Sequence, residues 1–156
     1  MKVTDKYVFF WGEWLSNFYP CSIQYDLKEF KSSEQLFMYL KALFFKDLET
    51  AELILKTNTP KEAKKLGRKI KNFDDEAWSK VREDIMFEVV KKKFVQNPNL
   101  LMKLMDSSLN NKIFVEASPF DRIWGIGFDE DHAIQNEVNW GENLLGKVIT
   151  SLRNML

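Results

Sequence analysis

The pattern of apolar and polar positions changes character along the chain. Near its start, aromatic and β-branched residues form short runs at 7–11, 21–25 and 28–31, separated by turn-forming residues. Such runs are typical of strands, and the Asp26-Leu27 pair between the last two runs predicts a hairpin. The opening of the chain therefore predicts strands and turns.

Longer periodic segments follow, and they predict helices. An N-cap signal at 32–35 precedes the segment 36–45, which is apolar almost all round and so predicts a central, buried helix. Asp74 or Asp75 caps a long helix that runs to Phe94. Further helices are predicted over 48–57, from Pro60 to Ile70, from Pro98 to Met105 and over 143–156.

The remaining segments complete the predicted fold class. Residues 113–117 are strand-like, whereas 118–139 show no period and predict irregular structure. No repeat, and no linker rich in Pro, Gly or Ser, divides the chain. The prediction is an α+β protein: a mostly helical single domain, residues 1–156, with a small N-terminal β-sheet.

Composition excludes several classes of protein. The chain has 156 residues, and its 23 basic and 23 acidic side chains give a net charge of zero, which argues against binding to nucleic acid or an acidic membrane through overall charge. The single Cys21 excludes a disulfide framework, and the single His132 argues against a zinc site and a His-based triad. The N-terminus lacks a signal-peptide core, and no apolar run approaches the roughly 20 residues that cross a bilayer. We therefore expect a cytoplasmic protein.

The neutral total hides an uneven distribution of charge. Residues 61–71 hold six bases and one acid, Glu62, and the run 91–93 adds three lysines. Residues 106–142 hold eight acidic side chains and two basic ones, Lys112 and Arg122. A solvated helix face is the commoner explanation of a basic run, and a phosphate-binding rim that includes Arg68 is the functional one.

The predicted central helix carries two ionisable groups, Glu34 and Lys41. Seven residues advance a helix by about 700°, so the two side chains lie on one face within about 20° and roughly 10.5 Å apart along the axis. Buried charges without partners are costly. Either the helix exposes a narrow solvated stripe, or the carboxylate and the amine line one pocket. In such a pocket the carboxylate could transfer protons or stabilise a cation, and the amine could act as a nucleophile.

A second candidate segment runs from Glu116 to Gly127. Glu116 and Asp121 flank a proline turn, and Trp124, Gly125 and Gly127 follow. Trp124 could stack on a flat ring, although a core anchor is the commoner role of a single Trp. Glycines let the backbone approach a ligand, but Gly-x-Gly without a third glycine argues against a dinucleotide-binding fold.

A third candidate is the polar pair Ser16-Asn17 beside Phe18 in an aromatic run. The Asn17 amide could hydrogen-bond to a base or to a sugar hydroxyl. Asn is also a common turn residue, and a turn is the default interpretation.

Eight segments, in this order, resemble the NADAR family of YbiA-like N-glycosidases, and the resemblance covers nearly the whole chain. Each segment is weakly specific alone, and the shared order is what makes the resemblance strong. The segments are Ser16-Asn17-Phe18; Ser33-Glu34-Gln35 with Lys41-Ala42; Leu66-Gly67-Arg68; Trp78; Lys93-Phe94; Val115-Glu116-Ala117-Ser118 with Asp121; Trp124-Gly125-Ile126-Gly127; and Trp140-Gly141-Glu142-Asn143-Leu144-Leu145-Gly146 ahead of Arg153.

The resemblance implies a mainly helical α+β fold and hydrolysis of an N-glycosidic bond to ribose. Substrates in the family include ADP-ribose attached to guanine and early phosphorylated riboflavin-pathway intermediates. This chain has Gln35 where riboflavin-type bacterial members tend to have His, and Glu142 where many relatives have Lys, Arg or Gly. The expected partner is therefore an ADP-ribose-containing or phosphoribosyl small molecule, or ADP-ribosylated DNA or RNA, and not a membrane.

The chemistry of this reaction suggests a role for each ionisable candidate. Cleavage of an N-glycoside builds positive charge on the sugar while the base departs, so one carboxylate stabilises that charge and an acid protonates the base. Glu34 and Asp121 are the candidates for these roles. Lys41 is the candidate nucleophile, which would form a Schiff base at C1 of an opened ribose. Alternatively, Lys41 binds a phosphate or tunes Glu34.

The remaining candidates are expected to bind the substrate. Trp124 and Phe18 would stack on the base or ribose, Asn17 and Asn143 would hold polar edges, and Arg68 would contact phosphate. No metal or cofactor is needed for this chemistry. A binding module that reads ADP-ribose or NAD without cleaving it is the alternative from another class. The full set of substrate-binding candidates is Ser16, Asn17, Phe18, Arg68, Glu116, Trp124, Gly125 and Asn143.

Overall fold

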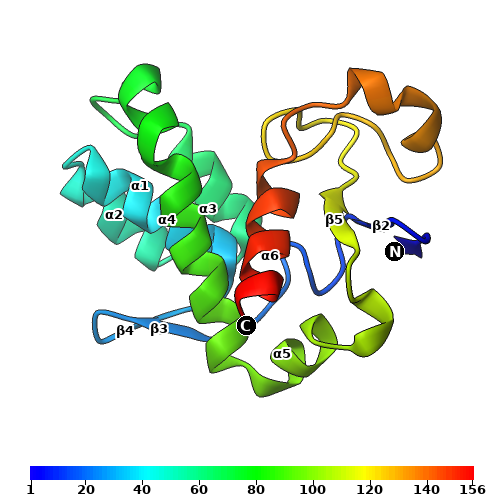
Figure 1. Cartoon of the computed structure of the whole chain (residues 1–156). Coiled ribbons are helices and arrows are strands. Elements are labelled where there is room, and N and C mark those ends of the chain that lie inside the picture. The colour runs from blue at the N-terminus through cyan, green and yellow to red at the C-terminus, as the bar shows by residue number, and fades with distance from the viewer. The chain divides into compact units, whose positions relative to one another are not determined.

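The computed structural model describes residues 1–156 (Figure 1). The chain forms two compact units, Asn17–Pro98 and the combination of Met1–Ser16 with Asn99–Leu156. Six α-helices, a three-stranded sheet and a two-stranded sheet confirm the predicted α+β class. The predicted single domain stays a prediction. None of the helices combines the length and the apolar character that crossing a membrane requires.

The unit of residues 17–98 is built around one helix. In it, α1 (Ser33–Phe44) packs against three other helices, and Leu36 and Ala42 on it are fully buried, as the sequence predicts for a central helix. Figure 1 shows these helices together with the β3–β4 hairpin. The other elements are β3 (Ile23–Tyr25), β4 (Lys28–Phe30), α2 (Leu48–Leu55), α3 (Pro60–Gly67) and α4 (Asp75–Gln96).

Local sequence signals set the ends of these elements. The Ser32 hydroxyl accepts the Gln35 N–H at 3.1 Å and so caps α1. Asp74 caps α4 in the same way, through the N–H groups of two residues in its first turn. The predicted hairpin turns at Asp26 and Leu27, whose φ values of 50° and 62° are left-handed, the conformation that tight two-residue hairpin turns require.

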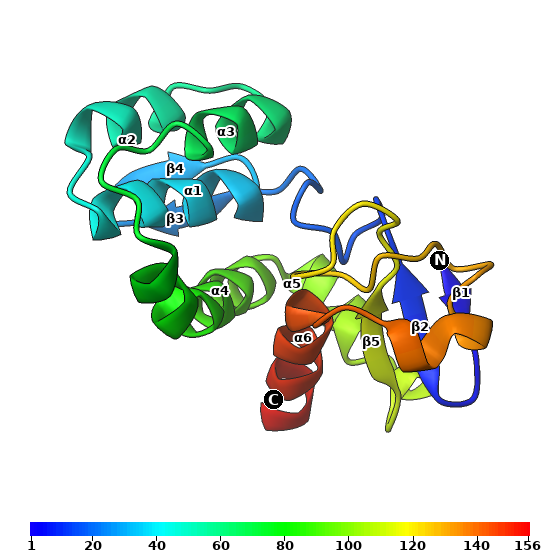
Figure 2. The ribbon, with the colours of Figure 1, turned by 90° about the horizontal axis from the view of Figure 1, so that it is seen from above.

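In the other unit a small sheet pairs the start of the chain with its second half. The strand order is β1 (Lys2–Val3), β2 (Tyr7–Phe10), β5 (Ile113–Glu116). β1 runs antiparallel to β2, and β5 runs parallel to it. Figure 2 shows α6 (Leu144–Met155) beside β5, against which it packs. α5 (Pro98–Leu104) begins at Pro98, the last residue of the first unit.

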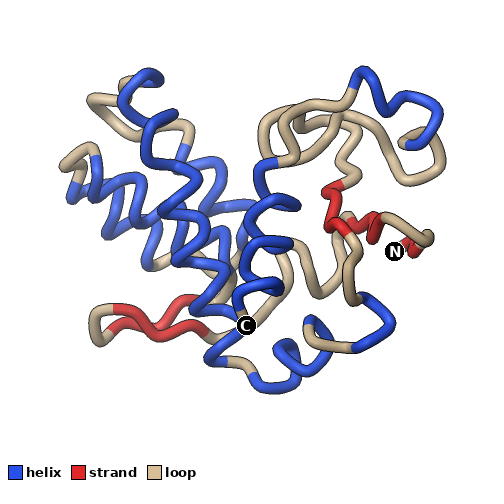
Figure 3. Tube along the Cα trace, in the orientation of Figure 1, coloured by secondary structure: helices blue, strands red, loops and turns tan.

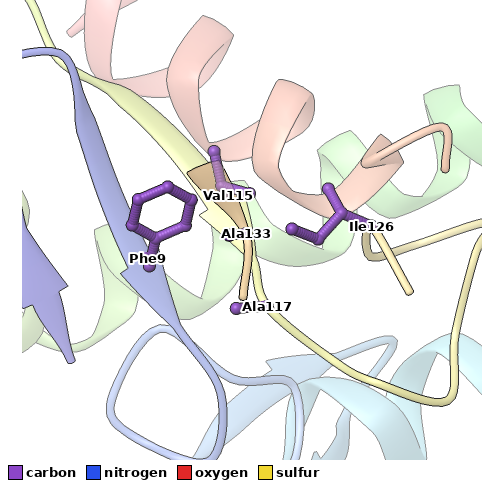
Figure 4. Close-up of a cluster of buried hydrophobic side chains, with 5 residues drawn as sticks. All are labelled: Phe9, Val115, Ala117, Ile126 and Ala133. Atoms are coloured by element: carbon purple, nitrogen blue, oxygen red, sulfur yellow. The ribbon is translucent and has the colours of Figure 1, made fainter. Parts of the chain in front are cut away.

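One face of the sheet contributes to a small apolar core (Figure 4). Phe9 of β2 and Val115 of β5 are fully buried there. Ala117, Ile126 and Ala133 complete the cluster from the chain that follows β5. This core therefore holds part of the irregular segment, including Ile126 next to Gly125, against the sheet.

Some element boundaries differ from the prediction. α3 ends at Gly67, so the buried Ile70 lies beyond the helix rather than on its apolar side. The segment 118–139 is mostly loop, as predicted (Figure 3), but it ends in a 3-10 helix, Ile134–Asn139. That helix lacks a side-chain N-cap bond and a buried face, so its sequence shows no helical period. The short β1 and the 3-10 helix Ser107–Leu109 were also missed.

Candidate active site

The Lys41 amine lies against a backbone carbonyl and two aromatic rings. Its Nζ donates a hydrogen bond to the Gly67 carbonyl oxygen at 3.2 Å. The same atom lies 4.8 Å from the centroid of the Phe73 ring and 5.8 Å from that of Trp78. Such distances allow an attraction between an ammonium group and the ring faces. The amine is therefore held in one place, on one side of α1.

Burial lowers the pKa of the Lys41 amine below its ordinary value, because the surrounding groups keep part of the water away. The negative charges of Glu34 and Asp75 act in the opposite direction and favour the ammonium form. The effect of Glu34 agrees with the prediction that the two side chains share a face of α1. A lysine with a lowered pKa has more of the unprotonated amine near neutral pH, and that form is the nucleophile.

Glu34 is buried in the first turn of α1, with 8% of its surface exposed. Its backbone N–H donates to the Asn17 carbonyl at 3.0 Å, which ties the chain before β3 to the start of the helix. A carboxylate in the first turn is favoured by the helix dipole. The neighbouring Gln35 bonds through its side chain to the backbone of Lys31 and to the end of α2, so this departure from the family pattern has a structural role.

The Asn17 side chain is also buried and offers an acceptor. Its Nδ2 donates to the Met86 Sδ at 3.4 Å, whereas its buried Oδ1 has no hydrogen-bond partner. Most buried amide oxygens in proteins are hydrogen-bonded. A hydroxyl or N–H of a bound ligand is the kind of group that would satisfy this oxygen, as predicted for Asn17.

The expected stacking and phosphate-binding residues of this unit lie at its surface. Phe18 has 38% of its surface exposed, and the Lys64 Nζ lies 5.7 Å from its ring centroid. Arg68 is exposed directly after α3. The basic face therefore begins beside an exposed aromatic ring. The run 91–93 does not extend it as expected, because Lys93 is fully buried.

In the other unit, Asp121 organises the loop that carries Trp124. Its Oδ1 accepts the N–H groups of Ile123 and Trp124, both at 2.9 Å. Its own N–H donates to the Ser118 hydroxyl at 3.2 Å. One carboxylate oxygen of Asp121 therefore fixes the turn and directs the chain toward the half-buried Trp124.

The amide of Asn143 connects the same loop system to β5. Asn143 has a left-handed φ of 53°, directly before α6. Its Oδ1 accepts the Glu116 N–H and its Nδ2 donates to the Phe114 carbonyl, each at 3.0 Å. Asn143 thus has a structural role at the end of β5, and its predicted contact with substrate stays a prediction.

Gly125 is required by the close approach of the backbone around it. A Cβ at this position would lie 2.8 Å from the Glu116 carbonyl oxygen and 3.0 Å from that of Asp121. The Gly125 carbonyl accepts the Asn143 N–H at 3.1 Å. Ser16, the last residue of the first segment of this unit, is buried and donates its N–H to the Glu13 carbonyl at 2.8 Å.

Each unit thus brings together part of the predicted set. Asn17, Glu34 and Lys41 are connected through the start of α1 and its shared face. Glu116, Asp121, Trp124, Gly125 and Asn143 form one hydrogen-bonded loop system at the end of β5. The prediction that Asp121 acts on the same ribose as Glu34 and Lys41 stays a prediction. No group of three or more His, Cys, Asp or Glu side chains is placed to hold a metal ion.

Sequence reasoning missed the immediate surroundings of Lys41. Phe73 precedes the cap of α4 and shows no signal beyond being an aromatic residue between two helices. Trp78 and Gly67 did carry a signal, since both belong to segments that resemble the NADAR family, but their contacts with Lys41 depend on how α3 and α4 pack on α1.

Comparison with known proteins decides the family. The NADAR domain matches residues 9–156 of this chain. The chain belongs to the NADAR family. The predicted resemblance is therefore confirmed, and the match covers the whole stretch in which the eight segments lie.

Three NADAR relatives place the chain further. An N-glycosidase of Acanthamoeba polyphaga mimivirus is 39% identical over 165 residues, which cover 96% of this chain and 96% of that protein. A riboflavin biosynthesis protein of Vibrio vulnificus is 30% identical over 91% of this chain, which corresponds to 35% of that protein. The NMR structure of E. coli YbiA matches 99% of this chain and 86% of its own, with a TM-score of 0.78 and 26% identity. These relatives confirm the fold and support a hydrolase of the N-glycosidase kind.

Proposed function

We propose that this NADAR protein hydrolyses the N-glycosidic bond between ribose and a base, and that it removes ADP-ribose from ADP-ribosylated guanine in nucleic acid or nucleotide. The observation that carries the proposal is the Lys41 amine, which is half-buried against aromatic rings within the electrostatic reach of the buried Glu34. An amine with a lowered pKa beside a carboxylate is suited to attack on an electrophilic carbon.

In the proposed reaction, the neutral Lys41 amine attacks C1 of the ribose. The C1–N bond to the base breaks, its electron pair leaves with the base, and Asp121 gives the base a proton. Because Oδ1 of Asp121 is held by the turn, the proposal assigns this proton transfer to Oδ2. A proton then moves from the Lys41 nitrogen to the ring oxygen, the C1–O bond breaks and a Schiff base forms on Lys41, and Glu34 stabilises the positive charge of this intermediate.

Water completes the cycle. It adds to C1 of the Schiff base and gives a proton to the Asp121 carboxylate, which restores the acid. The new C1 hydroxyl passes its proton to the Lys41 nitrogen as the C1–N bond breaks, and the ring oxygen then closes on the resulting aldehyde. The net change is one water consumed, with the hydroxyl on C1 and the hydrogen on the base. The amine returns to the Gly67 carbonyl and the aromatic rings, ready for another turnover.

The substrate-binding residues have matching surface chemistry. Phe18 and Trp124 offer ring faces for a base or ribose, and the buried Oδ1 of Asn17 offers an acceptor for a hydroxyl or amine. Arg68 and the exposed lysines of α3 offer positive charge to the diphosphate of ADP-ribose. The contacts of Ser16, Glu116, Gly125 and Asn143 shape the backbone on which these groups are carried.

A second candidate is cleavage of phosphorylated ribosylamino-pyrimidine intermediates of riboflavin biosynthesis. The similarity to the Vibrio vulnificus riboflavin biosynthesis protein, at 30% identity over 91% of this chain, favours it. The same amine, carboxylates and phosphate-binding groups would serve, because both substrates contain a phosphorylated ribose joined to nitrogen and differ in the base and in the adenosine monophosphate half of ADP-ribose. A reader that binds ADP-ribose or NAD without cleaving it would keep Asn17, Phe18 and Arg68 but would need neither a reactive Lys41 nor Glu34.

A substrate panel tests these alternatives. Purified protein is incubated with ADP-ribosylated guanine oligonucleotide, the corresponding nucleotide and the phosphoribosylamino-pyrimidine, and release of the free base and sugar is followed by chromatography. We expect release of ADP-ribose from the guanine substrates, and none with Lys41→Ala. The control is Lys56→Ala, which changes an exposed lysine at the end of α2. Cleavage of the pyrimidine substrate alone favours the second candidate, and binding without cleavage of any substrate overturns the proposed hydrolysis.

A further inference from the structure

A half-exposed ring to which the proposed chemistry assigns no role lies beside the Lys41 amine. Phe73 lies between α3 and α4 and keeps 46% of its surface exposed. Its ring centroid is 4.8 Å from the Lys41 Nζ, closer than that of the buried Trp78, at 5.8 Å. A ring that combines solvent exposure with contact to a half-buried amine is placed to control access of water to that amine.

The backbone on both sides of Phe73 is fixed. The Asp47 Oδ2 accepts the Lys71 N–H at 2.9 Å, and Asn72 then takes a left-handed φ of 63°. On the other side, the Asp74 Oδ1 accepts two N–H groups and starts α4. Only Asn72 and Phe73 lie between these two anchors, so hydrogen bonds on either side restrict the position of the Phe73 backbone.

Neighbouring rings support the same position. Phe73 packs on Phe45, with 5.3 Å between the ring centroids, and Phe45 packs in turn on Trp78 at 6.0 Å. The Lys41 side chain therefore rests against an aromatic group held by α1 and by the start of α4.

The third contact of the amine depends on a close helix crossing. A Cβ at Gly67 would lie 2.0 Å from the Met38 Sδ, so glycine lets the end of α3 approach α1. The Gly67 carbonyl then meets Lys41 at the carbonyl-rich end of α3, where the helix dipole favours a cation. A carbonyl and a ring face both favour the ammonium form, whereas burial favours the neutral amine.

We propose that Phe73 is a positioning residue for Lys41: its ring face and the Gly67 carbonyl hold the ammonium group in a resting position, while the bulk of the ring keeps water from the amine. The catalytic meaning of this inference rests on the proposed function, in which Lys41 is the reacting amine. The inference about the amine itself does not need a substrate. The Phe73 side chain then affects the pKa of Lys41 in two opposite ways. Its ring face favours the ammonium form, and its bulk, which excludes water, favours the neutral amine.

Two substitutions separate these effects. Phe73→Leu keeps an apolar side chain and removes the ring face, so it lowers the pKa of Lys41 by about half a pH unit. Phe73→Ala also removes the bulk. Because burial is the largest cause of the lowered pKa, admission of water raises the pKa of Lys41 toward that of an exposed lysine. Phe73→Tyr keeps both ring and bulk and leaves the pKa unchanged.

The pKa is measured without substrate. Lysines are reductively methylated with ¹³C-formaldehyde and titrated by NMR, and the Lys41 resonance is assigned by its loss in Lys41→Arg. Phe44→Leu is the matched control, because Phe44 is an equally exposed ring, 40% against 46%, that packs on Trp78 and Phe45. Thermal melting of each variant shows that the fold persists.

Opposite shifts for Phe73→Leu and Phe73→Ala, with little change for Phe73→Tyr and Phe44→Leu, support the proposal. An unchanged pKa of Lys41 in all four variants overturns the proposal. A shift of this pKa in the same direction in Phe73→Leu and Phe73→Ala also overturns it, since the ring face would then have no separate effect. The pH profile of turnover is expected to move with the measured pKa. If no substrate of the panel is cleaved, the proposed function fails. The titration needs no substrate and still tests whether Phe73 controls the environment of the Lys41 amine.

Discussion

Two lysines in the unit of residues 17–98, Lys41 and Lys93, differ in how far they are buried, although burial lowers the pKa of both. Lys41 on α1 is half-buried, beside the exposed Phe73 and in the field of two carboxylates. Lys93 on α4 has 1% of its surface exposed, and burial lowers its pKa to about 8. Its Nζ lies 5.2 Å from the Phe94 ring centroid and 5.9 Å from that of Tyr19.

This difference shows that a lowered pKa does not by itself identify a nucleophile. A reacting amine must also reach a carbon atom of the substrate, which requires a path from solvent. Lys41 lies beside the half-exposed Phe73, whereas Lys93 is enclosed by its surroundings. The negative charge that raises the pKa of Lys93 is that of the Cys21 thiolate rather than of a carboxylate. We therefore expect the two lysines to differ sharply in chemistry and in their effect on stability.

The largest expected difference is in covalent trapping. When active protein is mixed with ADP-ribose and borohydride, peptide mass spectrometry is expected to find the reduced adduct on Lys41 and none on Lys93, because only the former is accessible. Lys41→Arg should abolish the adduct, since arginine forms no Schiff base. An adduct on Lys93 would contradict the comparison, and no adduct in active protein would favour direct attack by water.

Turnover should show the next largest difference. Lys41→Ala and Glu34→Gln are each expected to lower kcat by at least about 100-fold, the usual scale for a positioned catalytic group, while the circular dichroism spectrum stays unchanged. Lys93→Met, of similar volume, is the matched variant and should retain kcat within about tenfold, because Lys93 is assigned no step. Wild-type rates in both Lys41→Ala and Glu34→Gln would remove these residues from the mechanism.

Lys93 should instead control how stability depends on pH. A lysine with a folded pKa of about 8 and an unfolded value near 10.4 binds fewer protons in the folded state between these values, so stability rises with pH in that window. The contribution is about 1.5 kcal/mol between about pH 8 and about pH 9.5. Urea unfolding across this range measures it.

The control for this experiment is the neighbouring half-buried Lys91. Lys93→Met should remove most of the rise in unfolding free energy, whereas Lys91→Met should keep it. An equal rise in wild type and Lys93→Met would show that burial of Lys93 does not set this pH dependence.

The contrast between these lysines also marks what the sequence can predict. The start of α1 was predictable because a cap is local: the Ser32 hydroxyl bonds three residues ahead. Glu34 and Lys41 were predictable as a pair because helix geometry places residues seven apart on one face. The burial of Lys93 was missed because the run 91–93 looks like a basic surface. A signal was present, since Lys93 lies three and four residues after the buried Val90 and Val89.

Contacts set by distant packing could not be predicted in this way. The parallel pairing of β2 with β5 joins strands about a hundred residues apart, Tyr7 with Ile113, and no local pattern specifies it. The contact between Lys41 and Phe73 depends on the left-handed Asn72 and on the anchor at Asp47. The two hydrogen bonds between the Asn143 side chain and β5 likewise form only when the loop before α6 packs against the sheet.

The smallest expected effect concerns the second carboxylate near Lys41. Asp75 lies exposed in the first turn of α4 and favours the ammonium form of Lys41 more weakly than burial opposes it. Asp75→Asn should therefore lower the pKa of Lys41 further, by less than about half a pH unit for an exposed charge. If the neutral amine limits the rate, kcat near neutral pH rises by up to about threefold, the opposite sign from Glu34→Gln.

The control is Glu76→Gln, which removes an exposed carboxylate one residue further along α4, where it pairs with Lys80 at 3.7 Å. Both variants weaken the favourable interaction with the helix dipole by a few tenths of a kcal/mol, so their melting temperatures should fall together while only Asp75→Asn shifts the acid limb of the pH–rate profile. The Lys93-dependent rise of stability should persist in both. A shift of the acid limb in Glu76→Gln as well would contradict this expectation. The pKa of Lys41 would then depend on the total charge of α4 rather than on Glu34 and Asp75 in particular.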